Sequence, residues 1–95
     1  MINEKKLAKA IDLNKKCLDK RIKKQLELGY NGYVRSDNLR KHKYEFGLPV
    51  EDQVRELQSH LINSYARMGY ACCMQQFLPG VEQSDNYILV FVKCQ

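Results

Sequence analysis

Side chains that could do chemistry are few and scattered in this sequence. The two histidines are His42 and His60, and His60 would share a helical face with Ser64. A catalytic nucleophile needs a base and an orienting group beside it, and no carboxylate motif, glycine-rich phosphate loop or nucleophile elbow accompanies this pair. We therefore expect a protein that is not an enzyme and that uses no cofactor.

The cysteines are also poorly spaced for chemistry. They are Cys17, Cys72, Cys73 and Cys94, with no Cys-x-x-Cys pair to hold zinc or to exchange disulfides. Neighbouring residues on a strand point to opposite faces, so Cys72 and Cys73 cannot both turn toward one ion. We predict small buried thiols and no metal site.

Charge is a stronger signal, because it is unevenly distributed along the 95 residues. Residues 1–48 contain 13 Lys and Arg against six Asp and Glu, a net charge of +7. Residues 49–95 have a net charge of −2, which gives the whole chain +5. This asymmetry predicts a surface that attracts an anionic partner, either nucleic acid or an acidic protein surface.

Lysines near the N-terminus recur at helical spacing and form one stripe. The stripe contains Lys5, Lys9, Lys16, Lys20 and Lys23, with Lys24 beside it. A solvated helix face is the alternative interpretation, because Asp12–Lys16 and Asp19–Lys23 are i,i+4 pairs in the stabilising orientation. The stripe is therefore either a row of cations that binds a partner or a face that keeps the protein soluble.

A segment that mixes tyrosines with cations follows the lysine stripe. It contains Tyr30, Tyr33, Arg35, Arg40, Lys41 and Tyr44. This mixture is typical of single-stranded nucleic-acid grooves, and equally of protein-binding surfaces. Alternatively, Tyr33, Leu39, Tyr44 and Phe46 fill the gap between the two long helices. We predict that the lysine stripe and this segment together bind the partner.

Two amphipathic helices are predicted to position these residues. The first covers residues 3–28, with Asn3 as its N-cap and Gly29 at its end. At ~1.5 Å per residue it is nearly 40 Å long, so we expect part of it to extend beyond the domain and to pack on a partner or a second copy. The second helix is predicted from Pro49 to Met68. Its apolar face consists of Val50, Val54, Leu57, Leu61, Tyr65 and Met68.

A small antiparallel sheet is predicted to support the helices. Residues 70–78 and 87–92 form a β-hairpin across a polar loop, and residues 30–35 form either a short edge strand or an ordered loop. Residues 36–39 are expected to cap a helical turn or two. The last strand is apolar at both alternating sets of positions, so its second face is either buried or exposed.

These elements predict one α+β domain over residues 1–95, with two long helices packed on a small antiparallel sheet in the order α-(β)-α-β-β. The long helix or the edge of the terminal strand could join copies into a homo-oligomer. The basic start is not followed by the apolar stretch that a secretory signal needs, and no apolar run is long enough to cross a bilayer. We expect a cytoplasmic protein without a membrane partner.

The whole pattern resembles small bacteriophage-encoded accessory proteins of the host-takeover or anti-defence type. The resemblance rests on a lysine-rich helix, a helix ending at Gly69-Tyr70, and a short closing strand from Tyr87 to Lys93. It implies a viral protein that acts by binding in the host cytoplasm. We expect a modulator or inhibitor that docks on an acidic protein. The alternatives are a non-specific DNA- or RNA-binding protein and a small virion or assembly subunit.

Overall fold

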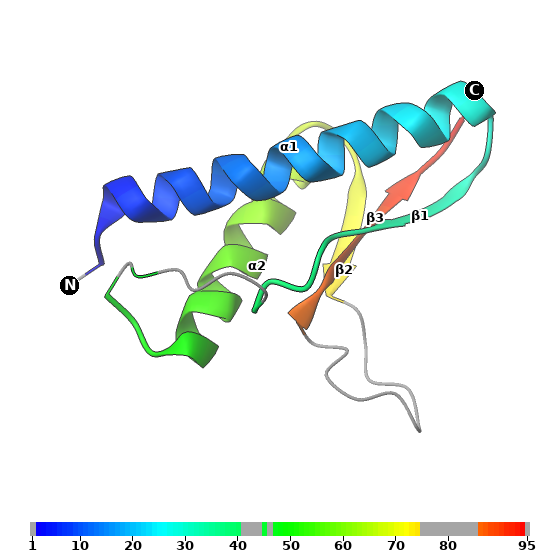
Figure 1. Ribbon diagram of the computed structural model, residues 1–95. Coiled ribbons are helices and arrows are strands. Elements are labelled where there is room, and N and C mark those ends of the chain that lie inside the picture. Colours follow the sequence, from blue (N-terminus) through cyan, green and yellow to red (C-terminus); the bar gives the residue numbers. More distant parts are fainter. Residues whose placement is uncertain (1, 41–44, 46, 75–85, 95) are drawn as a thin grey trace.

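The computed structural model describes residues 2–40, 45, 47–74 and 86–94. Along the chain the elements are α1 (Glu4–Leu28), β1 (Gly32–Arg35), α2 (Val50–Arg67), β2 (Ala71–Met74) and β3 (Ile88–Val92). Residues of both helices share one buried cluster with alternate residues of β3, so the helices cover the same face of the sheet. Figure 1 shows α1 lying across both α2 and the sheet. The predicted α+β class and element order are confirmed.

Local capping signals set the ends of α1. The side chain of Asn3 accepts a hydrogen bond from the backbone N–H of Lys6 at 3.2 Å, which satisfies one of the free donors of the first turn. Gly29 ends the helix with φ 72°, a left-handed conformation that glycine adopts without steric cost. Both ends of the predicted first helix are confirmed.

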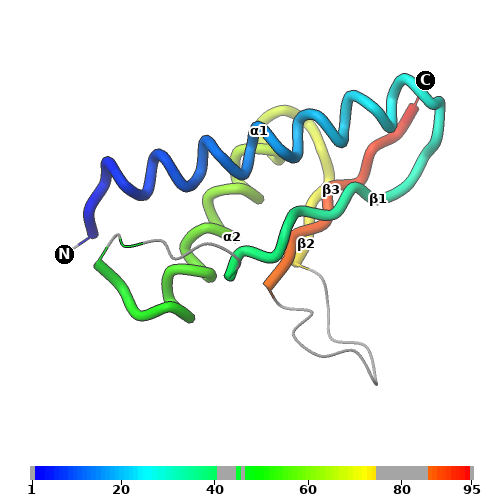
Figure 2. The backbone as a smooth tube through the Cα atoms, viewed as in Figure 1, coloured from blue at the N-terminus to red at the C-terminus, as the bar shows by residue number. Residues whose placement is uncertain are grey.

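Most of the length of α1 packs against the rest of the same protein. Its buried residues extend from Leu7 to Ile22, and its ~37 Å matches the longest dimension of 43 Å. Most of α1 therefore packs on its own domain, whereas Leu26 and Leu28 at its C-terminal end are exposed. That part of this helix packs on a partner or a second copy stays a prediction. Figure 2 shows the chain reversing there, so that β1 returns alongside the second half of α1.

In the part of the chain that the structure describes, the sheet has three antiparallel strands in the order β1-β3-β2. The predicted hairpin of β2 and β3 is confirmed, and residues 32–35 form an edge strand. β3 is paired on both sides, so the terminal strand cannot join copies edge to edge as predicted. Residues 75–78 of the predicted second strand, and all but Asn86 of the predicted 79–86 loop, lie outside the described residues.

Residues 36–39 were predicted to cap a helical turn or two. Leu39 and Arg40 form a turn in which Asn38 Oδ1 accepts from the N–H of Arg40 at 2.9 Å, and residues 41–44, where a helical turn would continue, lie outside the described residues. Ser36 itself continues the pairing of β1 with β3. Its backbone N–H donates to the carbonyl of Ile88 at 3.0 Å, and its Oγ accepts from the N–H of Ile88 at 2.9 Å. The hydroxyl therefore bonds a residue far along the chain instead of capping a local turn.

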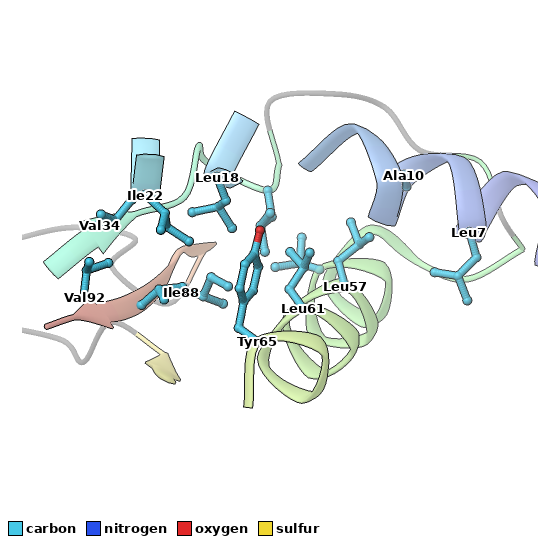
Figure 3. Packing of buried hydrophobic residues seen from close by; sticks show 13 residues of the cluster. Leu7, Ala10, Leu18, Ile22, Val34, Leu57, Leu61, Tyr65, Ile88 and Val92 are labelled. Carbon is cyan, nitrogen blue, oxygen red and sulfur yellow. The ribbon is translucent and has the colours of Figure 1, made fainter. Parts of the chain in front are cut away.

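The core follows the length of α1, and Tyr65 lies near its middle. Figure 3 shows the Tyr65 ring between Leu57 and Leu61 on one side and Leu18 on the other. The predicted apolar face of α2 is correct at its centre, but its outermost members Val50 and Met68 are exposed. They lie at the two ends of α2, which extend beyond the buried core.

Candidate binding surfaces

Six lysines of α1 form an outward-facing surface, which we call the lysine face. It consists of Lys5, Lys9, Lys16, Lys20, Lys23 and Lys24, and all six are exposed. The helical period places the first five opposite the buried residues that extend from Leu7 to Ile22. Because none of these lysines contributes to the core, they can contact a partner without any rearrangement of the fold.

Intramolecular ion pairs neutralise little of the lysine face. Lys16 Nζ lies 3.7 Å from Asp12 Oδ2, but both side chains are mostly exposed, so this pair contributes only ~0.3–0.5 kcal/mol. The predicted Asp19–Lys23 pair is not formed, because Asp19 Oδ1 accepts a hydrogen bond from the Tyr65 hydroxyl at 2.7 Å. Within the described residues the other five lysines of the face have no ion pair.

The tyrosines predicted to act with the lysine stripe point elsewhere. Val34 is buried on the helix side of the sheet, so Tyr33 beside it points to the opposite side. The lysine face points away from the sheet, and the two groups therefore face in opposite directions. Tyr30 follows the end of α1; its ring is exposed, and its carbonyl accepts a hydrogen bond from the Cys94 thiol at 2.9 Å.

Two arginines of the predicted binding segment have partners within the protein. Arg40 Nε donates to Asn86 Oδ1 at 2.9 Å, and its Nη2 lies 3.6 Å from a Glu51 carboxylate oxygen. The guanidinium of Arg35 lies 4.6 Å from the centre of the ring of Tyr87. The remaining members of that segment, Lys41 and Tyr44, lie outside the described residues.

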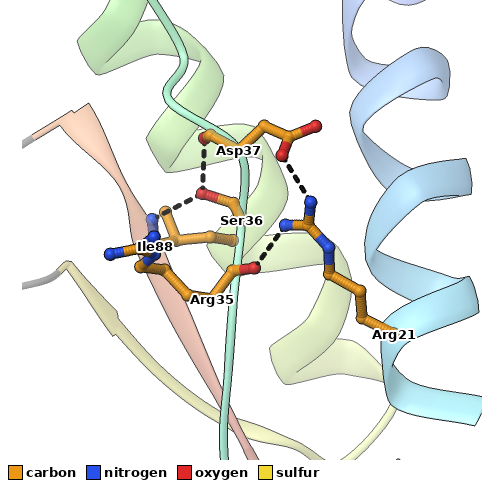
Figure 4. A network of polar contacts seen from close by, with 5 residues as sticks. All are labelled: Arg21, Arg35, Ser36, Asp37 and Ile88. Atoms are coloured by element: carbon orange, nitrogen blue, oxygen red, sulfur yellow. Dashed lines mark hydrogen bonds and ion pairs between the residues drawn. The ribbon is translucent and has the colours of Figure 1, made fainter. Parts of the chain in front are cut away.

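Arg21 connects α1 to the end of β1, a contact with no local sequence signal. Its Nη1 donates to the carbonyl of Arg35 at 2.7 Å, and its Nη2 forms an ion pair with Asp37. Figure 4 shows these contacts beside the hydrogen bond that the N–H of Ile88 donates to Ser36 Oγ. The cation of Arg21 is therefore used in holding the sheet to the helix.

A second exposed surface lies on the side of the sheet that faces away from the helices, and we call it the outer sheet face. Strand alternation places there Tyr33, Arg35, Ala71, Cys73, Tyr87, Leu89, Phe91 and Lys93. Tyr33 is 63% exposed and Phe91 is 40% exposed. The two-sided apolar pattern of residues 87–92 was the sequence signal for this surface. On its second face Phe91 is exposed, whereas Tyr87 and Leu89 are partly buried.

The remaining reactive groups are dispersed in the part of the chain that the structure describes, where no three metal-binding side chains cluster. His60 Nε2 lies 3.1 Å from Glu56 Oε1, one turn earlier on α2. Cys72 packs against the core and Cys73 is exposed, which agrees with their predicted opposite directions. The prediction of buried thiols is wrong, because Cys73 is exposed and the other three cysteines are only partly buried. Burial, and to a lesser extent the neighbouring Cys73, raise the pKa of Cys72 above its ordinary value.

Comparison with known proteins returns no match to a family model, to a curated protein or to a solved structure. Among the described residues, no helix is both long enough and apolar enough to span a membrane. Over its described residues the protein is of the α+β class, with two helices on one face of a three-stranded antiparallel sheet. The two exposed surfaces, the lysine face and the outer sheet face, are therefore the features that bear on its function.

Proposed function

We propose that this is a non-enzymatic binding protein of the phage accessory type, which docks on an acidic surface of another protein through the lysine face of α1. One observation supports the proposal above all: five exposed lysines on one side of a single helix have no acidic partner among the described residues. Uncompensated charge of one sign increases the rate of encounter with a surface of opposite charge and favours its orientation.

The rigidity of α1 supports the same function. Leu7, Leu18 and Ile22 hold its inner side against the core along most of its length, so the lysines project from a fixed support. A partner then restricts only the lysine side chains, which lowers the entropic cost of association. Its matching surface would present carboxylates along a line of comparable length.

Charge reversal on the lysine face tests the proposal. In the double variant Lys9→Glu/Lys20→Glu, each new carboxylate lies one turn from remaining lysines, so α1 should keep its stability. The matched control Arg55→Glu/Arg67→Glu makes the same change in net charge at exposed positions of α2. Affinity purification from the native cells, with nuclease treatment, should recover a protein partner with the wild type and the control and lose it with the lysine variant.

Two results would contradict the proposal. A partner retained equally by both double variants would mean that the lysine face is only a solvated surface. A partner that is removed by nuclease and is also lost with the lysine variant would show that the lysine face binds nucleic acid, which is the alternative function expected from the sequence.

A further inference from the structure

We propose that the outer sheet face binds single-stranded nucleic acid by stacking bases on Tyr33 and Phe91. This inference is independent of the function proposed for α1, because the outer sheet face and the lysine face point in opposite directions. Figure 1 shows β1 and β3, which bear these two rings, side by side in the sheet.

The two rings form an exposed aromatic pair at one level of the sheet. Tyr33 on β1 is in register with Phe91 on β3, and their ring centres lie 5.5 Å apart in an edge-to-face arrangement. On the other side of Phe91, β2 presents only the small side chain of Ala71. Bases could therefore reach both rings from the solvent, and aromatic side chains on an open sheet are a recognised stacking platform for unpaired bases.

The charge of the outer sheet face suits an anion. Its two charged residues are Arg35 and Lys93, both basic, and the strands contain no Asp or Glu. The guanidinium of Arg35 lies over Tyr87, which holds the cation on the aromatic surface. Arg35 and Lys93 lie near the two ends of the Tyr33–Phe91 region, where phosphates on either side of the stacked bases could reach them.

The size of the outer sheet face favours a nucleic-acid strand over a second copy of the protein. A stable protein interface uses ~20–30 residues and ~800 Å² on each side. Among the described residues this face has eight, well short of that number, so packing of two such faces would bury too little surface. Two stacked bases need no more than the aromatic pair and its neighbours.

The first test compares oligonucleotides that differ only in their bases. Fluorescence anisotropy should detect binding of a labelled pyrimidine 12-mer at ~50 mM salt, with much weaker binding of an abasic strand that has the same number of phosphates. Two phosphate contacts predict a slope of about −1.4 in log K against log salt for single strands. Equal binding of the two strands, no binding at all, or a slope near −3.5, which five lysines would produce, would overturn the proposal.

Variants then locate the binding to the sheet. Tyr33→Thr removes the ring and keeps a residue that favours strands, and should weaken binding at least about fivefold, the lower end of the stacking contribution of one base. Tyr30→Thr is the matched control, because Tyr30 is 61% exposed but lies outside the sheet. Equal effects of the two substitutions would contradict the proposal.

Substitutions of the second ring distinguish a loss of binding from a loss of folding. Phe91→Thr should weaken binding as Tyr33→Thr does, with Phe91→Leu replacing it if circular dichroism shows that the threonine variant is unfolded. Light scattering should show the same mass for the wild type and both sheet variants. If the substitutions instead dissociate a dimer while the 12-mer does not bind, the face is an interface between copies and the proposal is wrong.

Discussion

The hydroxyl of Tyr65 donates a hydrogen bond to Oδ1 of Asp19 at 2.7 Å and so joins α2 to α1. The Tyr65 ring is fully buried, whereas Asp19 lies at the exposed edge of the contact between the helices. The same carboxylate could have paired with Lys23 one turn later, but that pair would be exposed and worth only a few tenths of a kcal/mol. A hydrogen bond from a buried phenol to a carboxylate is stronger.

Removing this hydroxyl should measure the strength of the contact. We expect Tyr65→Phe to lower the free energy of unfolding by about 1–2 kcal/mol, because the ring still fills its space while the hydrogen bond to a charged acceptor is lost. Urea denaturation monitored by circular dichroism measures the change. Asp19→Asn keeps an acceptor and should cost less than Tyr65→Phe. A loss below about 0.5 kcal/mol for Tyr65→Phe would show that the bond contributes little.

The same hydroxyl predicts a specific loss of stability at alkaline pH. Burial, and then the hydrogen bond to Asp19, raise the pKa of Tyr65 above its ordinary value of 10.0. The contribution of this group is complete below pH 10 and is lost as the pH rises further, because the unfolded chain ionises there while the folded one does not. The stability difference between the wild type and Tyr65→Phe should therefore shrink by about 1.4 kcal/mol per pH unit above pH 10.

Unfolding measurements at several pH values between 8 and 11 test this prediction. All other groups are common to the two proteins, so their effects cancel in the difference. A difference that stays constant over this range would mean that Tyr65 ionises as easily in the folded protein as in the unfolded one.

Two leucines of α1 test which side of the helix supports the fold. Leu18 is 1% exposed in the centre of the core, whereas Leu13 is 45% exposed on the outer side. Leu18→Ala should cost about 2–5 kcal/mol through lost burial and the cavity it leaves. Leu13→Ala should change stability by less than about 0.5 kcal/mol. Similar losses in thermal or urea unfolding would mean that the helix is rotated from the orientation described.

The outcome for α1 shows which features could be predicted from the sequence. The Asn3 cap, the end at Gly29 and the apolar stripe act over a few residues, so they define the bounds of the helix and the direction of its lysine face. Likewise, the β-branched residues at 88–92 define a strand without knowledge of its neighbours. Such local features sufficed for the fold class and for the outward direction of the lysines.

Features that depend on distant residues could not be predicted in this way. Ser36 bonds Ile88, 52 residues later, and Asp19 bonds Tyr65, 46 residues later. Strand alternation separates Tyr33 from Val34 but does not say which side the helices cover. The sequence therefore grouped Tyr33 with the lysines, although the packed structure places it on the opposite side.

Ser36 offers a test of the strand extension. Its hydroxyl oxygen accepts from the buried N–H of Ile88, so Ser36→Ala leaves this donor without that partner. We expect a loss of about 1–3 kcal/mol in the free energy of unfolding. Ser59→Ala is the control, because Ser59 is exposed on α2. Faster amide exchange of Ile88 in Ser36→Ala would locate the effect, and unchanged exchange with unchanged stability would contradict it.

The adjacent cysteines of β2 should differ in reactivity although they share a backbone. Cys73 is exposed on the outer sheet face, whereas Cys72 packs against the core and its thiol lies 3.8 Å from the carbonyl oxygen of Tyr70. Burial raises the pKa of Cys72, which lowers the fraction of reactive thiolate near pH 8.

Iodoacetamide at pH 8 should therefore alkylate Cys73 several-fold faster than Cys72. The single variants Cys72→Ser and Cys73→Ser, followed by mass spectrometry, assign each rate. In urea the two rates should converge, because unfolding exposes both thiols to the same solvent. Equal rates in the folded protein would mean that the strand does not hold Cys72 against the helices, and the assignment of the inner and outer faces of β2 would then be wrong.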